Sequence, residues 1–441
     1  MAGETIFALS SGQPPVGVAV IRISGPGVRF GLETLIGAVP EPRRACLRSI
    51  RSGSGDVLDR GLVLFFAGPG SFTGEDVAEL HVHGGRAVVA TVLERLAGLS
   101  GFRPAEAGEF TRRAFSNERL DLTQVEGLAD LVAAETEAQR RQALLRVDGT
   151  IARLYEGWRQ RLVRARALIE AELDFADEED VPASASSEAW RIAEAVRQEI
   201  VKHIEDRRGE RVREGAEIVI LGPPNAGKSS LVNAIARRDV AIVTAEPGTT
   251  RDMIEVRVDL DGYAATLVDT AGLREAEGVV EREGVRRAEE RAARADLVLW
   301  LGDVRAGAGA SPALAAPVVR VGTKVDTIDS GTERARLLAE FDWGVSSVTG
   351  EGVAELLVGL GRTVADKLGG GESVVVTRAR HRAALRVCAE AIAAGLRDDG
   401  RGLELRAEDL RLAGDALGRV TGRIGVEEML EVVFRDFCIG K

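Results

Sequence analysis

Apolar and polar positions follow different periods along the chain, and the period changes from one region to the next. Up to about residue 117, short β-branched runs separated by Gly and Pro predict strands. These strand-like runs are residues 16–23, 61–66 and 77–82, with one helical run at 85–96. From about 120 to 213, apolar residues recur every three or four positions, as Leu162, Leu168 and Ile169 do. That spacing predicts long amphipathic helices.

A third pattern, in which strands and helices alternate, runs from Gly215 to about Gly371, and helical spacing then returns until the end of the chain. Such alternation predicts an α/β domain, whereas consecutive amphipathic helices predict a bundle. The expected fold class is therefore α/β and α+β multidomain, with a P-loop α/β domain inserted into a helical bundle. The predicted domains are an N-terminal α+β domain at 1–118, two helical parts at 119–213 and 372–441, and the inserted domain at 214–371.

The composition excludes several classes of protein. The 441 residues include 58 Lys and Arg against 69 Asp and Glu, so the formal charge is −11 and a uniformly basic nucleic-acid-binding surface is excluded. Cys46, Cys388 and Cys438 are too few and too scattered for a disulfide framework or a four-ligand zinc site. The chain has no run of about 18 apolar residues and no basic start followed by an apolar core. We therefore expect a soluble, cytoplasmic protein.

A glycine-rich segment after the strand-like run 216–221 has the spacing of a phosphate-binding loop. Residues 222–229 read Gly-Pro-Pro-Asn-Ala-Gly-Lys-Ser, and a helical run follows at 230–236. Glycines let the backbone N–H groups face phosphates at a helix N-terminus. The lysine of this loop is expected to reach the β- and γ-phosphates and its serine to bind Mg²⁺. The phosphate-binding residues predicted are Asn225, Ala226, Gly227, Lys228, Ser229 and Ser230.

Three further segments distinguish a GTPase from an ATPase or a kinase. Thr250, in Gly248-Thr249-Thr250-Arg251-Asp252, can supply a second Mg²⁺ hydroxyl from a switch loop. Asp269-Thr270-Ala271-Gly272 follows a strand, so that Asp269 can make a water-mediated Mg²⁺ contact and the Gly272 N–H can sense a γ-phosphate. In Thr323-Lys324-Val325-Asp326 the Asp326 carboxylate can accept two hydrogen bonds from guanine, and adenine lacks that arrangement. Ser346 and Ser347 fit the last guanine-contacting loop.

The residue after the Asp-Thr-Ala-Gly segment is Leu273, where many small GTPases have a glutamine that orients the attacking water. Leucine cannot hydrogen-bond water, so either hydrolysis is slow or other groups replace the glutamine. Asn225 could hold a monovalent cation beside the phosphates, and Glu281 is the best-placed carboxylate for the water. The alternatives are that Asn225 only shapes the turn and that Glu281 is a solvated helix charge, and the residues alone leave both interpretations open.

Several segments outside the phosphate loop resemble one family, that of the tRNA modification GTPases called MnmE or TrmE. The resemblance covers essentially the whole chain and rests on residues 4–8, 20–26, 71–76, 83–85, 108–115 and 120–122. Its most distinctive part is the ending Phe437-Cys438-Ile439-Gly440-Lys441. The resemblance implies a Ras-like GTPase domain and a homodimer formed through the N-terminal domain. It also implies a flavin-dependent partner, MnmG or GidA, in a heterotetramer.

The family activity implied is the addition of an aminomethyl or carboxymethylaminomethyl group at C5 of the wobble uridine of certain tRNAs, with a tetrahydrofolate as one-carbon source. The folate residues implied are Arg22, Glu79, Arg119 and Lys441, where Arg119 replaces a lysine that is more usual in the family. The K⁺ site maps to Asn225, Thr244, Glu246 and Thr249, so the switch-loop residues Ala245, Pro247 and Gly248 join the predicted GTP-binding set. The resemblance assigns Glu281 to the attacking water.

Three questions remain open beside this reading. Cys438 resembles a cysteine of the family's modification chemistry, and its alternative is a buried structural thiol. The alternative function is an assembly switch like the ribosome-associated GTPase Era, which would have no use for Arg22, Glu79 or the C-terminal ending. A local basic cluster could bind tRNA or form a solvated face of ion pairs, and its members are Arg378, Arg380, His381, Arg382 and Arg386.

Overall fold

The computed structural model describes residues 3–174, 185–238, 240–242, 254–269, 290–309, 311, 314–328, 331–368, 376–397, 400–424, 434 and 440. The chain divides into two compact units, each composed of separate segments. Unit 1 contains residues 1–129, 145–196 and 390–441, and unit 2 contains 130–144 and 197–389. Among the described residues, no helix is both long and apolar enough to cross a membrane.

Unit 1 begins with a six-stranded mixed sheet of order β3-β4-β5-β2-β1-β6. The strands are β1 (Thr5–Leu9), β2 (Val16–Ser24), β3 (Cys46–Arg51), β4 (Val57–Phe66), β5 (Val77–Gly84) and β6 (Phe102–Pro104). All pairs are antiparallel except β1 with β6. Strand β2 lies between β1 and β5, so its alternate side chains face two different environments.

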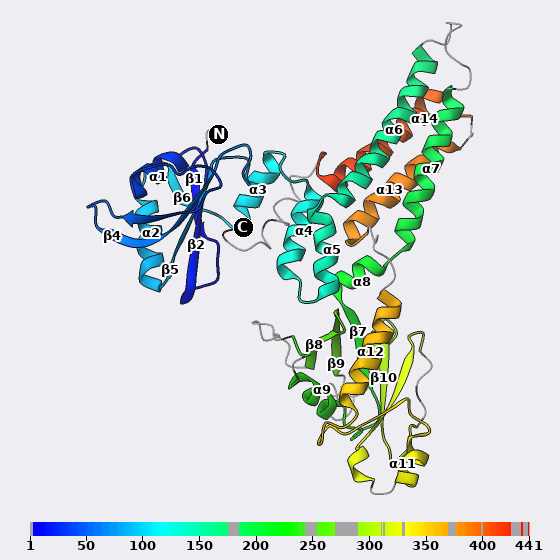
Figure 1. Ribbon diagram of the computed structural model, residues 1–441. Coiled ribbons are helices and arrows are strands. Elements are labelled where there is room, and N and C mark those ends of the chain that lie inside the picture. The colour runs from blue at the N-terminus through cyan, green and yellow to red at the C-terminus, as the bar shows by residue number, and fades with distance from the viewer. Residues whose placement is uncertain are drawn as a thin grey trace, which may run out of the picture. The chain divides into compact units, whose positions relative to one another are not determined.

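Helices α1 (Val28–Ile36) and α2 (Arg86–Ala97) cover one face of this sheet (Figure 1). Their buried positions, such as Leu32 and Leu35 in α1 and Val92 in α2, recur at helical spacing. They pack on the alternate strand residues Ile21 and Leu80. The other face of the sheet carries the intervening residues of β2 and β5, which are more polar.

The remaining helices of unit 1 are α3 (Glu109–Ser116), most of α4 (Leu122–Ala133), α6 (Thr150–Asp174) and α14 (Leu403–Thr421), with parts of α5 (Glu137–Val147), α7 (Ala185–Glu205) and α13 (Ala379–Leu396). Helix α6 packs against α14 along its length (Figure 1). Tyr155, Trp158, Leu162 and Ile169 form the buried stripe of α6, so the helical period predicted there from Leu162 and Ile169 is correct.

Unit 2 contains a second six-stranded sheet of order β12-β11-β10-β7-β9-β8, in which only β8 is antiparallel to its neighbour. The strands are β7 (Ala216–Leu221), β8 (Ile254–Leu260), β9 (Tyr263–Asp269), β10 (Leu297–Asp303), β11 (Val318–Thr323) and β12 (Trp343–Val345). The helical elements around it are α8 (Arg208–Glu214), α9 (Lys228–Ala236), η2 (Val325–Thr327), α11 (Gly331–Leu338) and α12 (Val353–Leu368).

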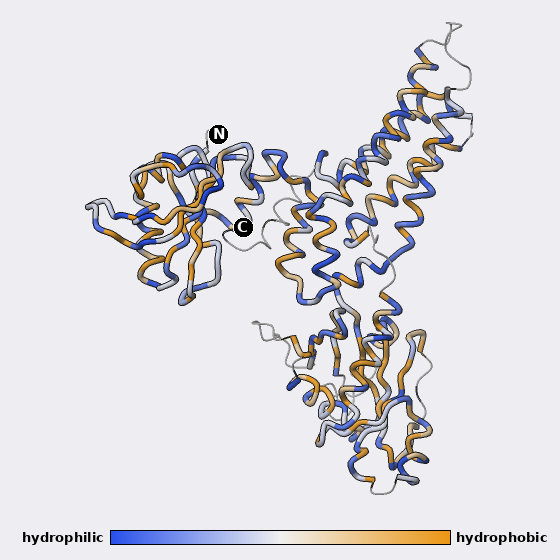
Figure 2. The backbone as a smooth tube through the Cα atoms, in the orientation of Figure 1, coloured by the Kyte–Doolittle hydropathy of each residue, from blue (hydrophilic) through white to orange (hydrophobic). Residues whose placement is uncertain are grey.

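The central strands of unit 2 are apolar on both faces, as expected for a parallel sheet covered by helices. Figure 2 shows β7 and β10 as mostly hydrophobic runs, and every residue of β7 except Glu217 is buried. On one side the apolar faces of α9 and α12 complete the core. Together with the helices and the α+β sheet of unit 1, this sheet confirms the predicted fold class, which has a Ras-like P-loop domain inserted in a helical bundle. The domain boundaries given above remain predictions.

Candidate functional site

The phosphate loop of unit 2 joins the end of β7 to the start of α9. Gly222 has φ +150°, and a Cβ there would lie 2.3 Å from the backbone oxygen of Leu301 in β10, so only glycine fits without a shift of the backbone. Asn225 and Gly227 have φ values of +62° and +84°, the left-handed region that asparagine and glycine tolerate best. The loop therefore turns so that the unpaired N–H groups at the start of α9 mark an anion site.

Polar side chains gather around this loop. Lys228 is buried, and its Nζ donates to the carbonyl oxygens of Gly222 (3.0 Å) and Pro223 (2.9 Å). Its ammonium group therefore lies over the phosphate loop, where it is predicted to bind the phosphates. Ser229 lies in the first turn of α9, and Asp269 ends β9 with 1% of its surface exposed. A hydroxyl and a carboxylate are hard oxygen ligands, which suit Mg²⁺ directly or through water.

The predicted guanine-binding loop follows β11. The Thr323 hydroxyl donates to the carbonyl oxygen of Ala226 at 2.8 Å, so its side chain joins the base loop to the phosphate loop. Lys324 Nζ donates to Asp303 Oδ2 at 2.8 Å. Burial opposes ionisation of Asp303, but hydrogen bonds from Lys324 and the Arg305 amide lower its pKa below the usual value.

Two serines and one aspartate complete the described part of this site. Asp326 is exposed in η2, so its carboxylate is accessible to a ligand. Ser346 is fully buried, and its Oγ accepts hydrogen bonds from the Val348 and Thr349 amides. It therefore shapes the loop after β12, while Ser347 beside it is half-buried. Sequence reasoning missed Asp303, although an acid at the carboxyl end of a buried parallel strand is a recognisable signal.

Several predicted site residues lie outside the described residues, and their placement is not part of the structure. These are Thr244, Ala245, Glu246, Pro247, Gly248, Thr249, Thr250, Thr270, Ala271, Gly272, Glu281, Cys438 and Lys441. The described part of the nucleotide site is therefore the phosphate loop, Asp269 and the two base-side loops.

A second polar site lies on the sheet of unit 1, where Arg22 of β2 and Glu79 of β5 are direct cross-strand partners. The Glu79 Oε1 atom accepts hydrogen bonds from Arg22 Nη2 (2.9 Å) and Nε (3.1 Å). The Arg22 guanidinium carbon lies 5.8 Å from the ring centroids of both Phe72 and Phe110. This pair of opposite charges is partly buried between aromatic rings, an environment in which an added polar ligand would also be desolvated.

Of the other predicted folate residues, the structure describes only Arg119, which lies in the same region of unit 1. Arg119 is exposed, and its stem lies 3.2 Å from the position of a Cβ added at Gly74, in the loop that also carries Phe72. Near the other end of the chain, the Ser10 hydroxyl donates to the Gly440 carbonyl oxygen at 2.8 Å. Ser10 directly follows β1, a neighbour of β2, so Gly440 lies beside this sheet.

An ionic network at the start of α3 was not assigned a role from the sequence. Glu109 is 2% exposed, and its carboxylate accepts hydrogen bonds from Arg103, Arg113 and the Glu106 amide. Burial raises its pKa, but these hydrogen bonds outweigh burial and lower the pKa to about 2. Arg113 also contacts Glu75 at 3.1 Å. The network fixes α3, and with it Phe110, against the sheet.

The basic cluster considered for tRNA binding is not a free basic surface. Arg378 Nη2 contacts Asp130 Oδ1 at 2.8 Å, and Arg382, only 6% exposed, forms an ion pair with Glu210 at 3.0 Å. His381 is fully buried. At these three residues the structure favours the alternative of ion pairs, because a guanidinium buried against a carboxylate is already neutralised.

The order of elements in unit 2 defines a class of protein: a phosphate loop after β7, an aspartate at the end of β9 and a base loop after β11 make it a P-loop GTPase. Two family models match the chain. The model described as the MnmE helical domain matches residues 122–438, and that of the GTP-binding protein TrmE N-terminus matches residues 5–119.

Two full-length relatives are named tRNA modification GTPase MnmE. The chain is 54% identical to the protein of Mesorhizobium japonicum over 443 residues, covering 100% of both chains. It is 52% identical to that of Brucella anthropi over 440 residues, covering 99% of this chain and 98% of the relative. Aquifex aeolicus Era has a solved structure that is 23% identical and covers 42% of this chain and 68% of its own, with a TM-score of 0.29, which is too low to support an argument.

The chain belongs to the MnmE (TrmE) family of tRNA modification GTPases. It is accordingly a GTP hydrolase that acts in tRNA modification and uses GTP with Mg²⁺. Membership over the full length favours tRNA modification over the alternative of an Era-like switch.

Proposed function

We propose that the protein uses GTP hydrolysis to drive addition of an aminomethyl or carboxymethylaminomethyl group at C5 of the wobble uridine in certain tRNAs. A tetrahydrofolate bound to unit 1 supplies the one-carbon unit, and a flavin-dependent protein of the MnmG/GidA type is the partner in a heterotetramer. The observation that carries this proposal is the Arg22–Glu79 pair beside the docked Gly440. A GTPase that only timed the binding of a partner would not need such a site.

In the GTPase domain, Lys228 and the N–H groups at the start of α9 bind the β- and γ-phosphates. Ser229 and Thr250 hold Mg²⁺, and Asp269 contacts it through water. The metal supplies positive charge against the oxygens on which negative charge develops. Asp326 selects guanine, because its exposed carboxylate can accept both guanine donors.

A second cation, K⁺, is proposed at Asn225, Thr244, Glu246 and Thr249. Support comes from Asn225, whose left-handed backbone and exposed side chain leave the amide oxygen available at the edge of the phosphate loop. A K⁺ ion would provide the charge that an arginine supplies in other GTPases. Glu281 orients the attacking water in place of the missing glutamine. Face-to-face pairing of two GTPase domains completes the site.

The folate pocket is proposed around Arg22 and Glu79, with Arg119 and Lys441. A pterin offers N–H donors that a carboxylate accepts, and the glutamate tail of a folate offers carboxylates that pair with cations. Glu79 therefore binds the pterin, while Arg22 and Arg119 bind the carbonyl or anionic side. Phe72 and Phe110 present apolar rings beside Arg22. Cys438 takes part in the modification chemistry at this pocket.

Dimerisation is proposed through the face of the first sheet that α1 and α2 leave open. Leu47, Leu62, His81 and Val20 are consecutive cross-strand neighbours on that face, one row from Arg22 and Glu79. Leu47 is 50% exposed and Leu62 is 44% exposed. An exposed apolar row of this kind is typical of a protein interface. The proposed compartment is the cytoplasm, where tRNA and the partner protein are present.

The folate pocket is tested by titrating 5-formyltetrahydrofolate into the full-length protein and into Glu79→Ala by calorimetry. A hydrogen bond to a charged group is worth about 1.5–3 kcal/mol, so the variant should bind about tenfold more weakly or worse. Its GTP hydrolysis should match the wild-type rate, because Glu79 belongs to the other compact unit.

Asp59→Ala is the matched control, since Asp59 lies on the same sheet and pairs with His83 rather than with Arg22. That variant should bind the folate as the wild type does. Equal folate affinity in Glu79→Ala and wild type would show that the pocket lies elsewhere.

A further inference from the structure

The hairpin formed by β8 and β9 connects the nucleotide site with the helices of unit 2. Seven consecutive residue pairs, from Ile254 with Asp269 to Leu260 with Tyr263, join the two strands without a bulge. At about 3.3 Å per residue the hairpin is roughly 20 Å long. One of its ends carries Asp269, the predicted Mg²⁺-water residue. The other end is the Asp261–Gly262 turn.

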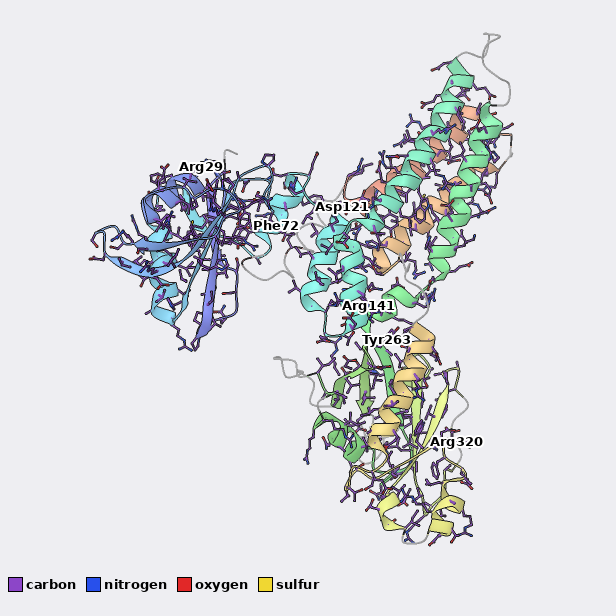
Figure 3. The ribbon with its side chains drawn as sticks, viewed as in Figure 1. Arg29, Phe72, Asp121, Arg141, Tyr263 and Arg320 are labelled. Carbon is purple, nitrogen blue, oxygen red and sulfur yellow. The ribbon has the colours of Figure 1, made fainter. Side chains whose placement is uncertain are left out.

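The turn end of the hairpin contacts the beginning of α5. The Ala138 amide donates to the Gly262 carbonyl oxygen at 3.0 Å, and the Gly262 amide donates to Asp259 at 2.7 Å. Arg257 of β8 forms an ion pair with Glu135 at 2.9 Å. Figure 3 shows Tyr263, the first residue of β9, at the end of the sheet that faces α5, where Arg141 is labelled.

The two chain crossings that connect the GTPase domain to the helices contact the same short segment. Asp130 Oδ1 accepts hydrogen bonds from Arg213 Nε (3.1 Å), just before β7, and from Arg378 Nη2 (2.8 Å), after α12. The Gln139 side-chain Nε2 donates to the Arg213 carbonyl oxygen at 3.1 Å. The segment from Asp130 to Gln139 therefore contacts three parts of unit 2. These are the chain before β7, the chain after α12 and the β8–β9 hairpin.

These polar contacts differ in how easily they can rearrange. Side-chain exposure is 37% for Arg257 and 22% for Glu135, whereas it is 7% and 18% in the Arg382–Glu210 pair nearby. A partly exposed pair can break and re-form at low cost because water replaces the lost partner, and a buried pair cannot. The Asp130 carboxylate is 15% exposed and pairs with two arginines, so the loss of one pair leaves the other in place. The single Glu135–Arg257 pair is therefore the more adjustable contact.

We infer that the β8–β9 hairpin transmits the nucleotide state to α5, with Glu135 and Arg257 as the positioning residues that couple GTP hydrolysis to tRNA modification. A shift of the strands at the Asp269 end moves the Gly262 turn, because the paired strands act as one rigid element. The turn moves α5 through the Ala138 hydrogen bond and the ion pair, while Asp130 holds the domain crossings in place. This inference rests on the tRNA-modifying activity, but it does not depend on the folate or on the flavin-dependent partner.

The test measures two quantities for Glu135→Arg, Arg257→Glu and the double exchange. One is the GTP hydrolysis rate of the purified full-length protein. The other is wobble-uridine modification, measured by nucleoside mass analysis in a strain in which each variant replaces the deleted wild-type gene. Coupling between sites typically changes an affinity about 5–150-fold. Each single variant should hydrolyse GTP within about twofold of wild type but modify tRNA at least about fivefold less per GTP. The double exchange should restore modification.

Glu408→Arg serves as the matched control, because Glu408 makes a comparable pair with Arg411 within α14; it should change neither quantity. If a reversed charge prevents folding, Glu135→Gln removes the charge without reversing it. This variant should also keep GTP hydrolysis while losing tRNA modification. Full modification by the single variants would overturn the inference, as would a parallel loss of both activities that the double exchange does not repair. The wild-type gene in the same strain should restore wobble-uridine modification. If it does not, the proposed function fails; if it does and the variants behave otherwise than expected, only the coupling inference fails.

A physical measurement complements the activities. Hydrogen exchange of the peptide that contains Ala138 should differ between the GDP complex and a complex with a non-hydrolysable GTP analogue, because its amide donates to the moving turn. The difference should disappear in Glu135→Arg. Identical exchange in the two wild-type complexes would contradict a moving hairpin.

Discussion

The Glu109 network allows a quantitative prediction about the stability of unit 1. All the hydrogen bonds to the Glu109 carboxylate require its ionised form: two from Arg103 at 2.6 and 2.8 Å, one from Arg113 at 3.0 Å and one from the Glu106 amide at 2.9 Å. Its pKa falls from the model-peptide value of 4.5 to about 2 despite burial. Each pKa unit corresponds to about 1.36 kcal/mol, so the ionised network contributes roughly 3 kcal/mol to folding.

The pH dependence follows from the direction of this shift. Because the folded pKa is lower than the unfolded one, the contribution is complete above pH 4.5 and is lost as the pH falls toward 2. Glu109→Gln should destabilise the sheet of unit 1 by roughly 3 kcal/mol at pH 7. The penalty should not be larger, because Arg103 and Arg113 keep Glu4 and Glu75 as partners. The difference between variant and wild type should shrink as the pH falls from 5 to 2.

Hydrogen exchange in a urea series at pH 7, read from peptides of β1 and β2, would give the free energy of local unfolding. Pulse proteolysis with pepsin would follow the same difference from pH 5 to 2. Glu137→Gln is a suitable control, because hydrogen bonds from Arg140 and Arg141 also lower the pKa of Glu137 to about 2. These ion pairs are exposed and contribute little to stability. A Glu109→Gln protein within about 0.5 kcal/mol of wild type, or a constant difference down to pH 2, would refute the argument.

Four other predictions concern the nucleotide domain and one thiol. Asp326→Asn should lower the affinity for GTP and favour xanthine nucleotides. Competition binding would measure this, and an unchanged preference for GTP would contradict the prediction. Replacing K⁺ by Na⁺ at constant ionic strength should slow hydrolysis in wild type and have little effect in Asn225→Ala; an unchanged wild-type rate would remove the cation from the mechanism. Gly222→Ala should abolish nucleotide binding, because its Cβ would lie 2.3 Å from the Leu301 oxygen; normal GTP affinity would contradict this. Burial raises the pKa of Cys388 to about 12, so it should resist alkylation at pH 8 in the native state, which mass analysis of labelled protein would check.

Local signals in the sequence were sufficient for much of the GTPase domain. The expected strand at 216–221 agrees with β7, and the strand expected directly before Asp269 is β9, because both segments are largely apolar. The phosphate loop needed only its own spacing, since glycine and asparagine carry its unusual backbone angles. Asp303 was missed because its partner, Lys324, lies 21 residues away, directly after the neighbouring strand β11.

The basic cluster at residues 378–386 shows the limit of such reasoning. Five basic residues within nine positions indicate either a nucleic-acid surface or a set of ion pairs, and the choice depends on what faces them. Arg382 faces Glu210, and Arg378 faces Asp130, which is 248 residues away. No local pattern encodes a contact at that distance along the chain.

By itself, the sequence determined the periods of its helices and strands, the order of its nucleotide-binding segments and its resemblance to one family, because these properties depend on neighbouring residues. Only the tertiary structure decided which charges meet. The register of β2 on β5 placed Arg22 opposite Glu79, 57 residues away, and burial made that pair a site rather than two surface charges. In the same way, folding brought Arg213 and Arg378 to one carboxylate of Asp130, because strand register and desolvation are properties of the whole packed unit.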